Sequence, residues 1–113
     1  MKYLVTGGLG FIGSNFINSI SSNDNKILNI DKNTYASNDP KYCQKSLNNI
    51  SNVQFCLSDQ DKTIKSIIDF NPDIIVNFAA ESHVDRSIES PQSFIESNII
   101  STFNLLESFR TLL

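Results

Sequence analysis

Glycine is confined to one short stretch of this sequence. All four glycines of the 113-residue chain, Gly7, Gly8, Gly10 and Gly13, directly follow an apolar run at residues 3–5. Three of them have the spacing G-x-x-G-x-x-G, a variant of G-x-G-x-x-G. Glycine is needed where φ is positive or where a backbone approaches another group closely. The pattern therefore predicts a strand, a tight turn and a helix whose first N–H groups face a pyrophosphate.

An acidic residue follows at the distance that a dinucleotide site requires. Asp31 ends a second apolar run, at residues 26–31, eighteen positions after Gly13. A carboxylate there can accept hydrogen bonds from both adenosine ribose hydroxyls and repels a 2′-phosphate, which favours NAD over NADP. Lys32 weakens this preference slightly, because a basic neighbour could serve a 2′-phosphate. The alternative for Asp31 alone is a solvated turn carboxylate; combined with the glycines, the ribose role is favoured.

Hydrophobic periodicity predicts the elements that would hold these groups. We expect strands at residues 2–6, 26–31, 53–57 and 74–78, and helices at 10–21, from an N-cap at Asp61 to residue 70, and at 91–113. This alternation predicts an α/β fold, a Rossmann-type doubly wound parallel sheet of four strands in the order 3-2-1-4 with helices on both faces. A complete domain of this type has more strands, so we expect a partial one over residues 1–113.

The last predicted helix is unusually apolar. Ser90 as N-cap and Pro91 at the first helical position predict where it begins. One broad stripe is expected along it, made of Ile95, Asn98, Ile99, Thr102, Leu105, Leu106, Phe109 and Leu113. Ile100 and Phe103 widen the apolar surface beyond that stripe, and the predicted strand at 74–78 would form an open sheet edge. We therefore expect the chain to self-associate.

Composition excludes several classes of partner. The net charge of −3 gives no general attraction to nucleic acid. Cys43 and Cys56 lack metal-ligand spacing, so we expect no metal and reduced thiols in a cytoplasmic protein. No stretch approaches the length of a transmembrane helix, so we expect no membrane partner.

Residues 77–88, NFAAESHVDRSI, are more specific than the fold class. This block resembles the A-A-E-S-H-V-D-R-S-I segment of the dTDP-glucose 4,6-dehydratase family, within the extended short-chain dehydrogenase/reductase superfamily. The resemblance covers essentially the whole chain and the N-terminal part of the family, and includes TGGLGFIGS at 6–14 and DKNTYA at 31–36. UDP-galactose epimerases share the first block without E-S-H-V-D-R-S, and GDP-mannose dehydratases usually have Gln in place of Glu81.

The resemblance implies a set of cofactor contacts. They are Gly7, Gly10, Phe11, Ile12 and Gly13 at the pyrophosphate; Asp31, Lys32, Asn33 and Thr34 at the adenosine ribose; Asp59 and Gln60 at the adenine; Phe78, Ala79, Ala80, Glu81 and Ser82 at the nicotinamide ribose; and Ser97, where the family has a cofactor-contacting Thr. Ser82 would also reach the nucleotide-sugar substrate. Asn33 and Gln60 replace Leu and Ile of the family, which implies a wetter and weaker adenine pocket.

His83 has two interpretations. Beside carboxylates it could act as an acid/base group. The favoured alternative is that it orders its loop through hydrogen bonds to Asp85, Ser87 or the backbone. Asp85 and Arg86 are likewise expected to form a loop-ordering ion pair.

The resemblance also implies an activity and shows what this chain lacks. The full-length relatives are NAD-dependent lyases of deoxysugar biosynthesis that oxidise dTDP-glucose transiently at C4 and eliminate water, giving a 4-keto-6-deoxy sugar. Their Tyr-x-x-x-Lys pair lies downstream of the last helix, and none of Tyr3, Tyr35 and Tyr42 has Lys four residues later. We therefore expect an NAD-binding portion without catalytic residues or substrate domain, inactive alone.

Two alternatives to that assignment remain. The chain could be a non-catalytic dinucleotide-binding or interaction module. It could also be part of a UDP-glucose 4,6-dehydratase or a related sugar-nucleotide epimerase. The superfamily further implies a homodimer through the helix at 91–113.

Overall fold

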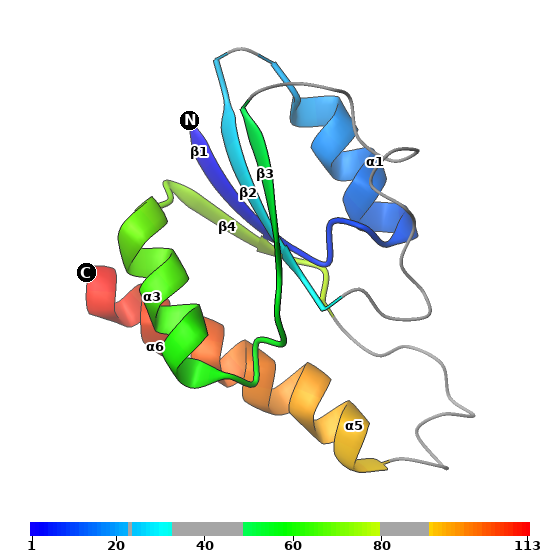
Figure 1. Ribbon diagram of the computed structural model, residues 1–113, viewed down its shortest axis with the longest axis vertical. Helices are drawn as coiled ribbons and strands as arrows, with labels where there is room; N and C mark the ends of the chain where they lie inside the picture. Colours follow the sequence, from blue (N-terminus) through cyan, green and yellow to red (C-terminus); the bar gives the residue numbers. More distant parts are fainter. Residues whose placement is uncertain (23, 33–48, 80–90) are drawn as a thin grey trace.

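A computed structural model describes residues 1–22, 24–32, 49–79 and 91–113. Its strands are β1 (Lys2–Thr6), β2 (Lys26–Asp31), β3 (Ile50–Gln54) and β4 (Ile74–Asn77). They pair in parallel in the order β3-β2-β1-β4 (Figure 1). The helical elements are α1 (Phe11–Ile20), α3 (Gln60–Phe70), α5 (Pro91–Ile95), the π-helical turn η1 (Glu96–Ile100) and α6 (Ser101–Leu112). The predicted strand order is confirmed.

The sheet is covered on both faces, as predicted. On one face α1 packs over a buried cluster formed by Val5, Ile17 and Ile27. On the other face α3 and α6 lie side by side (Figure 1). The cluster beneath them consists of Leu4, Leu28, Ile30, Leu57, Ile67 and Leu105. Neighbouring residues of a strand therefore face opposite layers, as the period of two requires.

The prediction for β3 is wrong by three residues. Ile50 pairs with Ile27 and Gln54 with Asp31, so the strand ends where residues 55–57 were expected to continue it. Phe55 and Leu57 are apolar because they pack into the core after the strand has ended. β1 and β2 have the predicted bounds, and β4 ends one residue early.

The N-cap of α3 is Asp59 and not Asp61. The Asp59 carboxylate accepts a hydrogen bond from the Lys62 N–H at 3.2 Å, which satisfies one of the orphan donors of the first turn. Asp61 lies inside that turn, where a negative charge is still favourable. The helix ends as predicted, with Asn71 in the left-handed conformation at φ 50° and its N–H donating to the Ile67 carbonyl at 2.9 Å.

The helix predicted over 91–113 contains a π-helical turn. η1 separates α5 from α6, and the Ser101 N–H reaches the Glu96 carbonyl across it. The Ser101 hydroxyl donates to the same carbonyl at 2.7 Å. A π turn adds one residue to the helical repeat and rotates everything after it about the axis.

The predicted apolar stripe does not face the core, apart from Leu105. The buried residues of α6 are mostly small and polar: Ser101, Asn104, Leu105 and Ser108. The exposed large apolar residues of this region are Ile95, Ile99, Ile100, Phe103, Leu106, Phe109 and Leu113. A smooth polar face can approach α3 closely because its groups are satisfied locally; the Ser108 hydroxyl, for example, donates to the Asn104 carbonyl at 2.7 Å.

None of the helices in the described part of the chain is long and apolar enough to cross a membrane.

Candidate functional site

The glycine turn joins β1 to α1 and lies against the end of β4. Gly7 has a φ of +69°, a region that favours glycine, and the Gly10 N–H closes the turn by donating to the Gly7 carbonyl at 3.1 Å. A Cβ on Gly7 would lie 2.7 Å from the Ala79 nitrogen and from the Phe78 carbonyl carbon. Gly7 therefore permits both the turn and the contact with the chain that leaves β4.

Gly13 and Gly10 are glycines for different reasons. A Cβ on Gly13 would collide with the Gly7 carbonyl and lie 2.9 Å from the Gly8 Cα, so packing of α1 on the turn requires glycine there. A Cβ on Gly10 would have one described neighbour within 4 Å, the Gly7 oxygen at 3.4 Å, which is ordinary contact. Its φ of −73° also suits any residue. Among the described residues, nothing requires glycine at position 10.

The first turn of α1 carries donors without helical acceptors. Gly10 is its N-cap and supplies no side-chain cap, and the turn has no acidic residue. The N–H groups of Phe11, Ile12 and Gly13 precede the first intrahelical bond, which Ser14 makes to the Gly10 carbonyl at 2.9 Å. These donors and the helix dipole form an environment suited to an anion.

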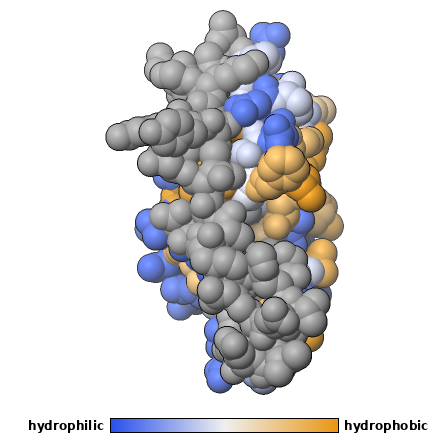
Figure 2. Space-filling view, turned by 90° about the vertical axis from the view of Figure 1, so that its right-hand side faces the viewer, coloured by the Kyte–Doolittle hydropathy of each residue, from blue (hydrophilic) through white to orange (hydrophobic). Residues whose placement is uncertain are grey.

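Two apolar side chains flank that helix start. Phe11 is 78% exposed and Ile12 66% exposed. Figure 2 views the side of the molecule that carries α1 and shows apolar residues grouped at its surface. Exposed apolar groups beside N–H donors that lack helical acceptors fit a ligand with both a charged and an apolar part.

Asp31 lies at the carboxyl end of β2, next to the glycine turn. Its side chain is buried, and Oδ2 accepts a hydrogen bond from the Leu9 N–H at 3.1 Å. Lys32 follows it and is half-buried. The structure therefore brings Asp31 and the glycines together, as the sequence predicted. Asn33 and Thr34 lie outside the described residues.

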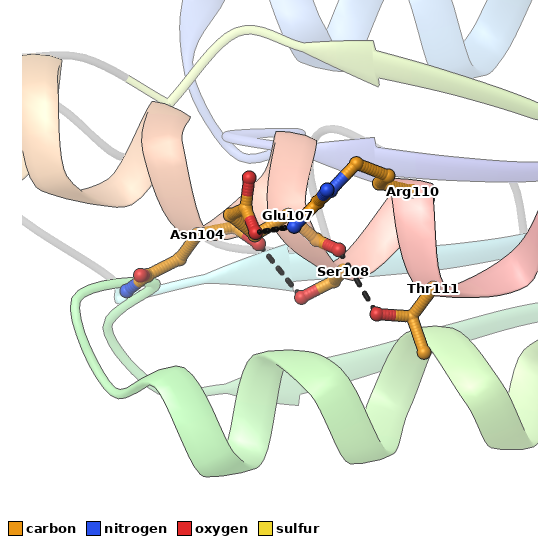
Figure 3. A network of polar contacts seen from close by, with 5 residues as sticks. All are labelled: Asn104, Glu107, Ser108, Arg110 and Thr111. Atoms are coloured by element: carbon orange, nitrogen blue, oxygen red, sulfur yellow. Dashed lines mark hydrogen bonds and ion pairs between the residues drawn. The ribbon is translucent and has the colours of Figure 1, made fainter.

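Asp59 and Gln60 lie at the carboxyl end of β3, where α3 begins. Gln60 is exposed, and the Asp59 carboxylate is the α3 cap. The turn before them is fixed at the Leu57 carbonyl, which accepts hydrogen bonds from Thr63 Oγ1 at 3.2 Å and from Asn104 Nδ2 at 2.8 Å. In Figure 3 the Asn104 side chain points from α6 toward this turn, while Ser108, Glu107, Arg110 and Thr111 bond within the helix.

Phe78 and Ala79 continue β4 past its last paired residue. The Phe78 N–H donates to the Thr6 carbonyl at 2.9 Å, and the Ala79 N–H donates to Thr6 Oγ1 at 3.2 Å. The Thr6 hydroxyl donates in turn to Asn77 Oδ1. Thr6 therefore joins the ends of β1 and β4 just before Gly7 begins the turn.

The described site residues lie along the carboxyl edge of the sheet, where the strand order reverses between β1 and β4. In open α/β sheets this switch point is where ligands bind. Ala80, Glu81, Ser82 and His83 lie outside the described residues. Ser97 lies in η1, and its side chain also lies outside them. No group of three His, Cys, Asp or Glu residues in the described part of the chain could hold a metal ion.

Several residues that shape the site were missed from the sequence. The side chains of Asn29, Thr6 and Asn104 bind backbone groups of Gly8, Ala79 and Leu57, respectively. The signal that could have found two of them is a polar residue in an apolar strand, Thr6 in β1 and Asn29 in β2. A buried amide or hydroxyl must be hydrogen-bonded, so such a residue marks a backbone group that needs a partner.

Comparison with known proteins decides the family. A sequence model described as GDP-mannose 4,6 dehydratase matches residues 4–113. The chain belongs to this family. The dTDP-glucose 4,6-dehydratase of Salmonella typhimurium is 43% identical over 112 residues, covering 97% of this chain and 31% of the relative. That of Escherichia coli K12 is 41% identical over 117 residues, covering 97% and 31%. The resemblance to dTDP-glucose 4,6-dehydratases is confirmed.

Solved structures agree with the fold. DesIV, a dTDP-glucose 4,6-dehydratase from Streptomyces venezuelae with NAD and TYD bound, is similar with a TM-score of 0.83 and 32% identity. The match covers 99% of this chain and 36% of DesIV. UDP-glucose 4-epimerase of Thermus thermophilus in complex with NAD has a TM-score of 0.84 at 26% identity, covering 99% and 34%. The chain thus spans about a third of the length of the proteins it matches.

Proposed function

We propose that this chain binds NAD and forms the cofactor-binding part of a nucleotide-sugar 4,6-dehydratase. The observation that carries the proposal is Gly10: its conformation and described surroundings would accept a side chain, yet it caps a helix start whose first N–H groups have no helical acceptor. A pyrophosphate approaching the backbone at this point explains the glycine. NAD in the solved relatives DesIV and the Thermus epimerase supports the choice of ligand.

The described residues would hold the cofactor at three places along the sheet edge. The donors of the first turn of α1 would bind the pyrophosphate, and Asp31 would accept hydrogen bonds from the adenosine ribose. Asp59 would accept a hydrogen bond from the adenine amine, and Phe78 and Ala79 would lie under the nicotinamide ribose. These contacts would put the adenosine over β2 and β3 and the nicotinamide over β4.

Seven other assignments rest on the family resemblance. Asn33, Thr34, Ala80, Glu81, Ser82 and Ser97 would complete the cofactor contacts, with Lys32 beside Asp31 and Ser82 also touching substrate.

The reaction would be shared between this chain and groups it does not contain. Bound NAD would supply reversible hydride acceptance, while the residues named above would bind and orient it. The substrate would be a nucleotide sugar, dTDP-glucose or UDP-glucose; TYD bound to DesIV and UDP-glucose bound to an epimerase of Thermotoga maritima support that class. Because no Tyr-x-x-x-Lys occurs in the sequence, we propose that these 113 residues have no activity alone.

The exposed apolar face of the last helix would form a homodimer interface. Phe103 and Leu106 are 55% and 64% exposed on α6, beside the exposed Ile99 and Ile100 of η1. Apolar surface of this kind on a helix usually marks a protein contact. We also propose a cytoplasmic location, which the free thiol of Cys56 supports.

Two specific alternatives remain, with the same cofactor site. One is a dinucleotide-binding or interaction module without catalysis, and the other is part of a UDP-glucose 4,6-dehydratase or a sugar-nucleotide epimerase. An assay for 4-keto-6-deoxy sugar formation by this chain tests the proposed lack of activity. Turnover would refute that proposal and would also exclude the non-catalytic module.

Calorimetric titration with NAD and with NADP tests the cofactor assignment. We expect NAD to bind at least about ten-fold more tightly, because Asp31 repels a 2′-phosphate. Asp31→Ala should weaken NAD binding, and the matched variant Asp69→Ala, which removes an exposed carboxylate from the far end of α3, should leave it unchanged. Equal or tighter binding of NADP would refute the ribose assignment.

A further inference from the structure

Asn29 is a fully buried amide in the middle of β2. Its neighbours Leu28 and Ile30 face the α3 side of the sheet, whereas Asn29 lies on the α1 side between Ile27 and Asp31. Burying an amide is unfavourable unless its groups are hydrogen-bonded. Asparagine at a fully buried strand position therefore calls for partners.

Both ends of the Asn29 amide have a partner. Its Oδ1 accepts a hydrogen bond from the Gly8 N–H at 2.8 Å, and its Nδ2 donates to Asn52 Oδ1 on β3 at 3.0 Å. The Gly8 N–H can only donate, which fixes the orientation of the amide. Asn52 is the register partner of Asn29, so the sheet itself holds the amide in place.

Gly8 is shaped to fit this amide. A Cβ on Gly8 would lie 2.6 Å from Asn29 Cγ, closer than real Cβ contacts come. The next N–H of the turn, that of Leu9, donates to Asp31 Oδ2 at 3.1 Å. Two side chains two residues apart on one face of β2 therefore accept from two consecutive donors of the turn.

This arrangement divides the donors of the glycine turn into two sets. Those of Gly8 and Leu9 are taken up by β2, and those that open α1 have no helical acceptor. We propose that Asn29 is a positioning residue of the dinucleotide site: it holds Gly8 so that the start of α1 faces the pyrophosphate. This inference rests on the proposed function and adds a residue that would not touch the cofactor.

The test separates the pyrophosphate from the adenosine. Asn29→Leu keeps the size of the side chain, removes the acceptor and leaves the Gly8 N–H without one. NAD and ADP should bind about ten-fold or more weakly, as expected for a buried donor left unpaired, while adenosine binding changes by less than about two-fold. Amide hydrogen exchange at Gly8 should accelerate in the same variant.

Two controls keep the result interpretable. Ile30→Val lowers stability from the opposite face of β2 and should leave the ratio of ADP to adenosine affinity unchanged. Asn52 is at an exposed position, and Asn52→Ala removes the partner of Asn29 Nδ2 while the Gly8 N–H keeps its acceptor. This variant should bind ADP about two- to ten-fold more weakly.

The outcomes distinguish the two proposals. If the unaltered chain binds neither NAD nor ADP, the proposed function is refuted and this inference with it. If the unaltered chain binds but Asn29→Leu binds ADP equally well, or loses ADP and adenosine equally, Asn29 has no positioning role. If Asn29→Leu does not fold, two other measurements decide. The positioning role is refuted if the Gly8 amide of the unaltered chain is not protected from hydrogen exchange, or if Asn52→Ala does not change ADP affinity.

Discussion

At Gly10, adding a single methyl group should weaken cofactor binding and leave the stability of the fold nearly unchanged. Gly10→Ala introduces a Cβ whose one described neighbour within 4 Å is the Gly7 oxygen at 3.4 Å, and the φ of −73° is ordinary for alanine. The chain can therefore accept the residue without rearrangement. A pyrophosphate lying against the backbone at this point would collide with the added methyl group.

The effect on stability is a small difference between two opposing terms. Alanine in place of glycine at a compatible φ stabilises by about 0.4–1 kcal/mol because it restricts the unfolded chain. At an N-cap, alanine is less favourable than glycine by roughly 0.5–1 kcal/mol. The terms offset each other, so Tm should stay within about 3 °C of that of the unaltered chain.

The effect on binding should be much larger. Forcing a methyl group into a close-packed contact costs about 1–3 kcal/mol, which corresponds to a Kd raised roughly 5- to 150-fold. Calorimetric titration with NAD measures this change, and a thermal melt of the same sample measures stability.

Gly13→Ala is the matched control, since its Cβ would collide with the turn itself. It should lower Tm by roughly 5 °C or more, whether or not NAD is present. If Gly10→Ala binds NAD as tightly as the unaltered chain, the backbone at Gly10 is not approached by the cofactor, and the reasoning fails.

Three further substitutions test other parts of the structure. Gly7→Ala should lower the free energy of unfolding in urea by about 2 kcal/mol or more, because a positive φ and the adjacent backbone both disfavour a side chain; an unchanged midpoint would contradict the turn geometry. Asn104→Leu should cost about 1–3 kcal/mol in the same assay, since the Leu57 carbonyl loses a buried donor; a stabilised variant would contradict this. Leu106→Glu should shift the chain toward monomer by light scattering, with Ile68→Glu on α3 as control; a monomeric unaltered chain at tens of micromolar would refute the interface.

The bounds of a strand were predicted best where turn-forming residues flank a clear apolar pattern. β1 ends just before the first glycine of the turn and β2 follows a polar turn cluster, so both strands have the predicted bounds. Strand order follows from the right-handed crossovers that parallel strands require. The association of Asp31 with the glycines was also predictable, because the carboxyl ends of adjacent parallel strands lie at one edge of the sheet.

Two of the failures share one cause: apolar character marks burial or contact and does not identify the element. Phe55 and Leu57 led to a predicted β3 that extends three residues too far, although they pack after the strand. In α6 the opposite occurred, because the inner face is built from Asn104 and Ser108 and the apolar stripe is exposed. Only the hydrogen bonds of the folded chain make a polar inner face favourable, and composition does not reveal them.

Polar residues that act through the backbone were also beyond the sequence pattern. Thr6 and Asn29 are single polar residues in apolar strands, and their partners, Ala79 and Gly8, are distant in sequence. Motif spacing locates the glycines, but the acceptors that fix the turn become apparent only when the strands are in register.

The most direct test of the cofactor site is an amide NMR titration of the labelled chain with NAD. We expect the largest shifts at the amides of Gly10, Phe11, Ile12 and Gly13, with smaller ones at Asp31 and none along α6. Saturable shifts centred elsewhere, or no shifts at millimolar NAD, would contradict this expectation.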